Sequence, residues 1–357
     1  MRSRLAFRLS LVLAVFGVLA AACSSDDPGT TGTSPVAADC TPAESPIVTV
    51  TAYSNVYDVY GKLISTFQSD WKESHNDQQV QFSTSFGGST TQAQNVIAGF
   101  PADVAALSLY PDIQLIEDAG LITHDPTQDP EGGIVATSAV VFDVRPGNPL
   151  NIDNWDDLAQ PGVEILTPDP ASSGGARWNI VAAYGAAMRG EVPGYPANDP
   201  AAAQQLLTDI FENVTVMDKS ANDSIKNFQA GNGDVAITYE YAVLAAQHSG
   251  LEDEMVIPPS TVAIQTPVSV IDTNAEAHCV QDVANAFVEF LHSDEAKELF
   301  LTVGFERSVD LTTARTSRST TCSRQTTSAA GTSCRTTRCS DRTAPSPRPW
   351  PPHRGSA

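Results

Sequence analysis

Gly174 and Gly175 stand where a strand-like run, residues 163–167, passes into an apolar helical run, residues 178–188. At such a junction Ser173 and the two glycines leave backbone N–H groups unpaired and unshielded by side chains. The dipole of the following helix adds partial positive charge there, so the junction could hold an anion without a cation. A glycine pair also makes ordinary turns, so this junction alone decides nothing.

Three further junctions follow predicted strands and are rich in small or hydroxyl-bearing residues. They are Tyr53-Ser54, Gly87-Gly88-Ser89 and Ser220-Ala221. In α/β folds the ligand lies beyond the carboxyl ends of the strands. Four junctions in repeated strand–helix context therefore predict one shared anion site.

The elements that must position these junctions alternate between strand and helix. Residues 47–53 alternate as a strand should, and the apolar residues from 56 to 71 fall on one helical face. Residues 134–144 predict a long strand, and residues 280–300 predict one long amphipathic helix. The alternation predicts an α/β fold with mixed sheets flanked by helices.

The N-terminus carries the marks of export. Residues 1–22 read as a signal peptide, with a basic start and an apolar stretch too short to span a membrane. Small residues precede Cys23 as in a bacterial lipobox, which implies a lipid on that thiol; an ordinary signal peptide is the alternative. Residues 23–46 then read as a lipid anchor and flexible tether. We expect a secreted protein, lipid-anchored to the outer face of the bacterial cytoplasmic membrane.

Charge divides the chain into an acidic body and a basic tail. The formal charge is −22, but residues 315–357 hold eight arginines and one acid, a net of +7, so the remainder carries −29. An acidic body argues against nucleic acid as a partner, whereas local N–H groups can still hold an anion. The tail lacks apolar periodicity and is predicted to be disordered. A reading-frame shift near Ala314, or a natural low-complexity extension, would explain the change.

Cysteines and histidines give no sign of a metal site or a catalytic site. Cys40 and Cys279 lie in the body, where an oxidising compartment makes a disulfide possible. The six histidines follow no ligand spacing and read as surface residues, so no metal and no cofactor is expected. A lipid-anchored serine hydrolase using Ser89 or Ser173 would need a base, but no histidine lies on a junction and no G-x-S-x-G elbow occurs. A structural envelope protein, with the glycines only as turns, stays open.

Residues 170–179, Pro-x-Ser-Ser-Gly-Gly-Ala-Arg-Trp-Asn, resemble the signature of bacterial sulfate- and thiosulfate-binding proteins. These are solute-binding receptors of ABC importers, and the likeness runs from about residue 47 to residue 309. It implies a two-lobed type II periplasmic binding protein, not an enzyme, with the ligand in the cleft between the lobes. The implied division is lobe 1 over 47–127 and 261–314, lobe 2 over 128–260, and a hinge near 134–144 and 256–268.

The resemblance also implies a ligand set of backbone N–H and hydroxyl donors. It comprises Ser54, Ser89, Ser173, Gly174, Gly175, Ala221 and Tyr239. Arg177, inside the first helical turn, is expected to brace the loop rather than to touch the anion.

The implied ligand is sulfate or thiosulfate, and the implied partners are the membrane permease subunits of an importer whose separate ATPase subunit uses ATP. A monomer is expected. The family has an indole donor where this chain has Tyr239, and an acidic residue where it has Ser54, which leaves the oxyanion open. Molybdate and phosphate are the alternatives, and a carboxylate such as Asp223 facing the cleft would favour a protonated oxyanion.

Overall fold

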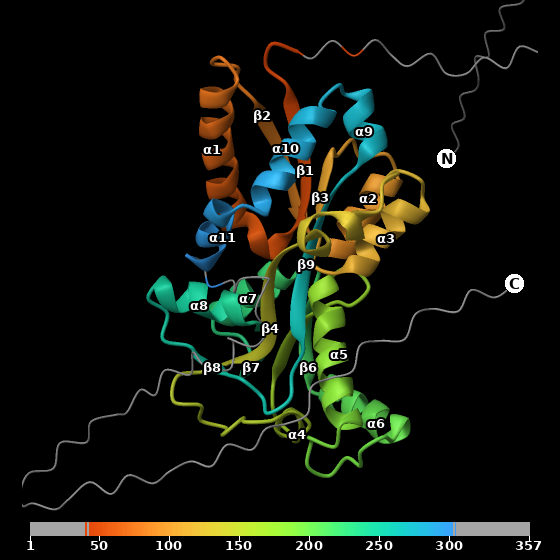
Figure 1. Cartoon of the computed structure of the whole chain (residues 1–357). Helices are drawn as coiled ribbons and strands as arrows, with labels where there is room; N and C mark the ends of the chain where they lie inside the picture. The colour runs from red at the N-terminus through yellow and green to blue at the C-terminus, as the bar shows by residue number, and fades with distance from the viewer. Residues whose placement is uncertain (1–39, 41–42, 303, 305–357) are drawn as a thin grey trace, which may run out of the picture. The chain divides into compact units, whose positions relative to one another are not determined.

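The computed structural model describes residues 40, 43–302 and 304 (Figure 1). The predicted signal peptide, Cys23, most of the predicted tether and the predicted tail over 315–357 lie outside the described residues. Within the described part, no helix has both the length and the apolar character needed to cross a membrane.

The strands of the described residues form one mixed sheet in the order β2-β1-β3-β9-β4-β7-β5-β6, with β8 paired to β4. Their bounds are β1 Ile47–Tyr53, β2 Gln81–Gly87, β3 Val104–Ala106, β4 Ile134–Val144, β5 Ile165–Pro168, β6 Val214–Asp218, β7 Val235–Tyr239, β8 Glu254–Val256 and β9 Ala263–Val270. β1 is parallel to β2 and β3, and β5 is parallel to β6 and β7. The predicted α/β fold with a mixed sheet is therefore confirmed.

The antiparallel strands β4 and β9 join the two parallel groups. β9 pairs with β3 over Val268–Val270, and its earlier residues pair with the first half of β4. The second half of β4, from Val140 to Val144, pairs with β7. Both strands therefore pass from one group of elements to the other, as Figure 1 shows.

Helices cover each parallel group. Their bounds are α1 Tyr57–Ser74, α2 Ser89–Ile97, α3 Tyr110–Asp118, α4 Trp155–Leu158, α5 Gly174–Met188, α6 Pro200–Glu212, α7 Ala221–Gln229, α8 Glu240–His248, α9 Asp272–Ala277, α10 Gln281–Leu291 and α11 Asp294–Leu301. Short 3₁₀ turns cover Ser54–Val56, Pro126–Gln128 and Pro130–Gly133. Helices α1–α3 and α9–α11 lie around strands β1–β3, and together these elements are called the first group (Figure 1). Helices α4–α8 lie around strands β5–β7, and together these are called the second group.

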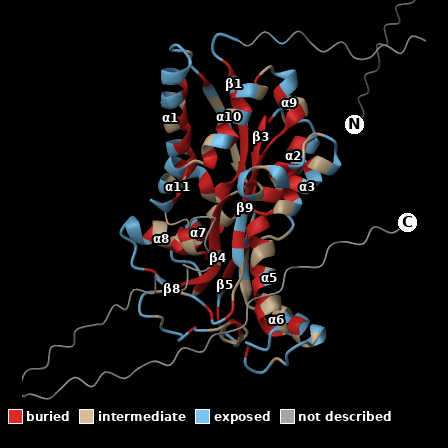
Figure 2. Cartoon of the chain, in the orientation of Figure 1, coloured by how far each residue is buried: buried red, intermediate tan, exposed pale blue. Residues whose placement is uncertain are grey.

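Helix α1 shows why the sequence folds this way. Its apolar residues recur at helical spacing, and one face from Val59 to Trp71 is buried, as predicted. Buried residues line the sheet-facing sides of the helices throughout both groups (Figure 2). The burial of these faces fixes where each strand ends, and hence where the four junctions lie.

Two predictions about the C-terminal helices and the histidines were wrong. The single helix over residues 280–300 is two helices, because α10 ends at Leu291 and the Ser293 hydroxyl accepts a hydrogen bond from the N–H of Ala296 to start α11. His292, at this break, is buried rather than on the surface, and burial lowers its pKa, with Glu131 and Asp129 opposing that shift. Helix α6 and strand β8 were not predicted.

A disulfide bond lies at the start of the described chain. The Sγ atoms of Cys40 and Cys279 are bonded, with their Cα atoms 5.2 Å apart. The bond ties the approach to β1 to the turn between α9 and α10, closing a sequence separation of 239 residues. It therefore holds the N-terminal end of the described chain on the first group.

Candidate anion-binding site

The four junctions meet at one small cavity, with a volume of about 10 Å³. Its lining comprises Tyr53, Ser54, Gly87, Gly88, Ser89, Ser108, Ser173, Gly175, Ala221 and Tyr239. Six of the seven residues predicted as the ligand set are among them. Gly174 does not line the cavity and instead packs against Ser108, Leu109 and Ser89.

Three helices begin at the cavity, and each presents its N-terminal end. α2 begins at Ser89, α5 at Gly174 and α7 at Ala221. Within the described residues, the N–H groups of Ser89, Gly175 and Ala221 have no protein acceptor. Unpaired first-turn N–H groups and three converging helix dipoles make the cavity electropositive without a cation.

The serines that precede α5 and α7 have different uses. The Ser220 hydroxyl caps α7 by accepting from the N–H of Asp223 at 3.2 Å, and it donates to the Asp223 carboxylate at 2.7 Å. Ser173 precedes α5 but makes no side-chain cap bond. The Ser173 hydroxyl, which lines the cavity, is therefore available to a ligand.

The glycines are needed for space rather than for turn geometry. Gly88 and the pair Gly174-Gly175 all have negative φ, so other residues could adopt their backbone conformation. A methyl group on Gly88 would lie 2.8 Å from the carbonyl oxygen of Lys219, and the carbonyl oxygen of Ser172 would be nearer still. Close approach of two backbones therefore explains Gly88, whereas a methyl group on Gly174 would collide with the side chains of Ser108 and Leu109.

Direct bonds join the first and second groups around the cavity. The Thr91 N–H donates to the Ser172 carbonyl at 3.3 Å, and the Trp178 indole donates to the Ser108 carbonyl at 2.7 Å. The N–H of Asn222 donates to the Ser54 hydroxyl at 3.3 Å. The structure is thus a closed arrangement in which both groups touch.

Asp112 is the residue that sequence reasoning missed. It is fully buried beside the cavity, and its carboxylate accepts from the Ser89 hydroxyl at 2.6 Å and from the Thr90 hydroxyl at 3.0 Å. Burial raises the pKa of Asp112, while the bonds from Ser89 and Thr90 and the charge of Arg177 oppose that shift. The Ser89 hydroxyl donates to Asp112 in this structure, and its predicted donation to the ligand stays a prediction. Ser89 keeps its backbone N–H.

Arg177 lies outside the cavity lining. Its Nε donates to the Pro170 carbonyl at 3.1 Å, and its Nη1 lies 3.3 Å from Oδ1 of Asp112. The side chain thus links the loop before α5 to the first group. This position suits the predicted bracing role, which stays a prediction.

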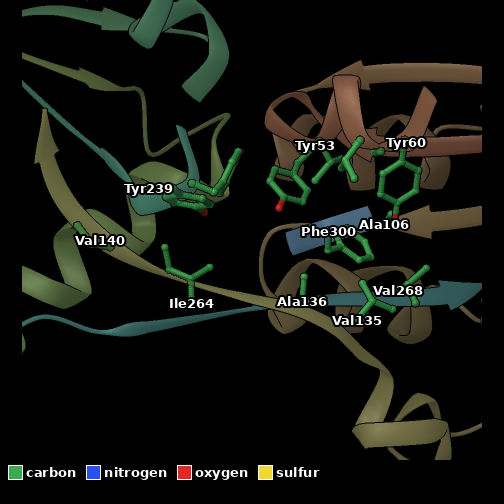
Figure 3. Close-up of a cluster of buried hydrophobic side chains, with 14 of the residues drawn as sticks. Tyr53, Tyr60, Ala106, Val135, Ala136, Val140, Tyr239, Ile264, Val268 and Phe300 are labelled. Carbon is green, nitrogen blue, oxygen red and sulfur yellow. The ribbon is translucent and has the colours of Figure 1, made fainter. Parts of the chain in front are cut away.

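Three residues that line the cavity, Tyr53, Ser108 and Tyr239, have buried hydroxyls without a protein partner of normal hydrogen-bond geometry. A Cβ on Gly175 would lie 3.5 Å from the Tyr239 oxygen and 3.4 Å from the Ser173 oxygen, which shows how closely these donors converge. Burial raises the pKa of Tyr239, so its O–H stays protonated. Figure 3 shows Tyr53 and Tyr239 opposite each other, with ring centroids 6.5 Å apart.

No carboxylate lines the cavity itself. Asp223 lies in a wider pocket of about 330 Å³ at its mouth, which shares Ser54, Gly87 and Gly88 with the cavity. In the part of the chain that the structure describes, no three His, Cys, Asp or Glu side chains gather as a metal site would require. The chemistry on offer is therefore hydrogen-bond donation to an anion.

Helix N-termini from two groups of elements meet at one cavity, and two long strands, β4 and β9, pass between the groups. This arrangement is that of a solute receptor of the periplasmic-binding-protein type. The chain belongs to the bacterial extracellular solute-binding protein family, whose model matches residues 48–306.

The chain is also similar to named relatives. It is 40% identical over 259 residues to a sulfate-binding protein of Synechococcus elongatus, covering 72% of each chain. It is 29% identical over 253 residues to a thiosulfate-binding protein of Escherichia coli, covering 70% of this chain and 73% of that one. Among solved structures it matches the sulfate-binding protein SubI from Mycobacterium tuberculosis, with a TM-score of 0.66 and 34% identity over 76% of this chain and 89% of that chain. These relatives are named as binding proteins rather than as enzymes.

Proposed function

We propose that this chain captures sulfate or thiosulfate in the cavity and delivers it to an ABC importer. The observation that carries the proposal is the convergence of three helix N-termini on one small cavity, with the N–H groups of Ser89, Gly175 and Ala221 unpaired. The names of the relatives point to the same ligands.

Selectivity would follow from what the cavity offers. Sulfate carries only acceptor atoms near neutral pH, and backbone N–H groups are donors only. The Ser89 hydroxyl donates its hydrogen bond to Asp112, and no carboxylate lines the cavity to accept a hydrogen bond from the ligand. A protonated oxyanion such as hydrogen phosphate would need a hydroxyl to turn and accept, at a cost of about 1–3 kcal/mol if none does.

Capture would involve closure of two lobes. The proposed lobes are residues 47–127 with 261–314, which would take in the first group of elements, and residues 128–260, which would take in the second. Their contacts through Thr91, Trp178 and Asn222 would form when the ligand brings them together. A lipid on Cys23 would keep this monomeric receptor beside the permease subunits, on the outer face of the cytoplasmic membrane.

Replacing Ala221 with proline tests the proposal with little disturbance of the fold. Ala221 is the first residue of α7, and Ser220 before it is extended (φ −138°, ψ 157°), so proline fits there but removes the N–H. Loss of one charge-assisted bond should cost about 1.5–3 kcal/mol, a weakening of about tenfold to hundredfold in sulfate affinity by titration calorimetry.

The matched control is Asp294→Pro at the first position of α11, which also follows an extended serine and lies in the first group away from the cavity. Its sulfate affinity should equal that of the parent. Sulfate, thiosulfate, molybdate and phosphate would be compared on the same preparations. Absence of saturable binding of every one of these anions to the folded parent would refute the proposed function.

A further inference from the structure

Asp143 is a carboxyl group that anion capture does not explain. It lies on β4, opposite Ala236 of β7 and Met255 of β8, and its side chain is fully buried. Neither carboxylate oxygen has a hydrogen-bond partner in the structure. An ionised carboxylate without partners in a protein interior is costly in free energy. The group must therefore either bind a cation or be neutralised by a proton.

A second buried acid lies within electrostatic reach. Asp253, on the approach to β8, is also buried, and its charge acts on Asp143. The positive charge of Arg145 acts on both acids. Its guanidinium is otherwise engaged, because it donates to the Phe228 carbonyl at 2.9 Å and to the Gly233 carbonyl at 2.7 Å. Arg145 therefore reduces the cost of charge without pairing either carboxylate.

The other charged residues on the elements around Asp143 make contacts elsewhere or lie at the ends of their helix. On α7, Asp223 bonds the Ser220 hydroxyl, and Lys226 lines a pocket with Asn55 on the side facing α1. On β8, Glu254 accepts from the N–H of Gly147 at 2.7 Å. On α8, the charged residues are at the ends, Glu240 in the first turn and His248 in the last.

Helices α7 and α8 cover the face of the sheet on which Asp143 lies, with α7 over β5 and β7 and α8 over β4. Directly paired residues of antiparallel strands share a face, so Ala236 lies on the same face as Asp143, and Thr238 follows two residues along that face. Ile225 and Phe228 of α7 pack against Ala236 in one apolar cluster. The hydroxyls of Thr238 and of Ser224, on α7, are likewise buried without a partner. Unpaired polar groups are thus enclosed between this face and the two helices.

We propose that Asp143 and Asp253 form a proton-binding site beneath α8 and beside α7 that links proton binding to anion capture. A proton on Asp143 removes the unpaired charge and supplies an O–H donor to the enclosed oxygens. Without it, two carboxylates repel each other beside α7, the helix whose first residue, Ala221, lines the anion cavity. Burial, together with the charge of Asp253, raises the pKa of Asp143 to about 7, with Arg145 opposing.

Anion and proton would therefore favour each other, and by linkage anion binding would draw a proton onto the protein. This coupling rests on the proposed anion site, whereas the proton site itself does not. The two parts can fail separately, and the measurements below distinguish them.

The proton site is tested by stability as a function of pH. Because the folded pKa is raised above the unfolded value, the contribution of Asp143 is largest below about pH 4 and is lost as pH rises to about 7. We expect urea unfolding to show this decline in the parent and not in Asp143→Asn. Asp70→Asn, an exposed acid on α1, is the matched control and should keep the parent slope. In Asp253→Asn, the decline should end at a lower pH, because the repelling charge is gone.

Asp143→Asn could also disturb packing, so the carboxyl carbon of Asp143 is followed by NMR in the unmodified protein. A midpoint near pH 7 supports the site, and a midpoint near the ordinary value of about 4 overturns it. Equal pH slopes for the parent and Asp143→Asn would also overturn it. A gain in stability on adding sodium at about pH 8, without proton release from Asp143, would assign the site to a metal cation and reject the proton.

The coupling is tested by calorimetry with sulfate, which stays a dianion over the range used. We expect affinity to weaken several-fold from about pH 6 to about pH 8, with proton uptake on binding measured in two buffers of different ionisation enthalpy. Asp143→Asn should show a flat affinity and no uptake. Uptake unchanged in that variant refutes the coupling. Failure of sulfate to bind at every pH refutes the anion site and leaves the stability and NMR measurements to decide the proton site.

Discussion

Substitution of Gly88 by alanine should hold the two groups apart without unfolding either one. Gly88 has φ −62° and ψ 131°, values that alanine adopts readily, so the strand and α2 that it joins are not strained. The added methyl group would instead meet the opposite wall, at 2.8 Å from the Lys219 carbonyl oxygen and 2.9 Å from the Ser172 carbonyl carbon. Both neighbours are backbone, so neither can rotate away.

The size of the effect follows from the displacement required. Normal contact begins at 3.4 Å, and the Ser172 carbonyl oxygen would be closer than either atom just named, so the walls must separate by about 1 Å. A hydrogen bond of about 2.9 Å lengthened by that amount is lost. An anion held by both walls would lose at least two charge-assisted bonds, worth together about 3 kcal/mol or more, which is a weakening of about a hundredfold.

The assay is sulfate titration calorimetry together with thermal unfolding. Gly88→Ala should bind at least about a hundredfold more weakly, yet unfold without ligand at a temperature close to that of the parent. Gly61→Ala is the matched control, because nothing lies within 4 Å of its added methyl group on α1. That control should bind normally and gain about 0.5–1 kcal/mol of stability. Parental sulfate affinity in Gly88→Ala would refute the inference that a methyl group at this position keeps the two walls of the cavity apart.

Three other substitutions test separate parts of the structure. Tyr239→Phe removes a buried hydroxyl that has no protein partner of normal hydrogen-bond geometry, so sulfate affinity should fall about tenfold while stability holds or rises; unchanged affinity would remove Tyr239 from the ligand set. Asp112→Ala leaves the Ser89 and Thr90 hydroxyls without their acceptor and should lower the free energy of unfolding in urea by about 1–3 kcal/mol; an unchanged midpoint would contradict that network. Replacing both Cys40 and Cys279 with serine opens a loop spanning 239 residues and should cost about 2–5 kcal/mol of stability, and a reductant should lower the parent's stability but not the variant's.

The sequence could predict those parts of the site whose chemistry is local. Each junction supplies unpaired N–H groups because a strand ends and a helix begins within a few residues, and both are legible in the apolar spacing. That is why Ser89, Gly175 and Ala221 could be named from their neighbours and are found at one cavity. Their convergence followed from a general property of α/β sheets and needed no pairwise contact.

The sequence could not predict partners brought together from distant segments. Asp112 lies 23 residues from Ser89, and the Ser108 carbonyl lies 70 residues from the Trp178 indole that donates to it. No periodicity in either segment signals these contacts. The break at Ser293 is different, because serine followed by two acidic residues is a helix-start signal. The continuous apolar spacing over residues 280–300 obscured it.

Helix α5 explains how an acidic body can close on an anion. Its first turn presents Gly175 to the cavity, while two side chains of the same turn, Arg177 and Trp178, contact Asp112 and Ser108 of the first group. Ligand contact and closure are therefore made by one rigid element, so an anion that draws the N-terminus inward also completes the bonds between the groups. The attraction comes from backbone dipoles at short range, where a body charge of −29 spread over the chain and screened by salt has little effect.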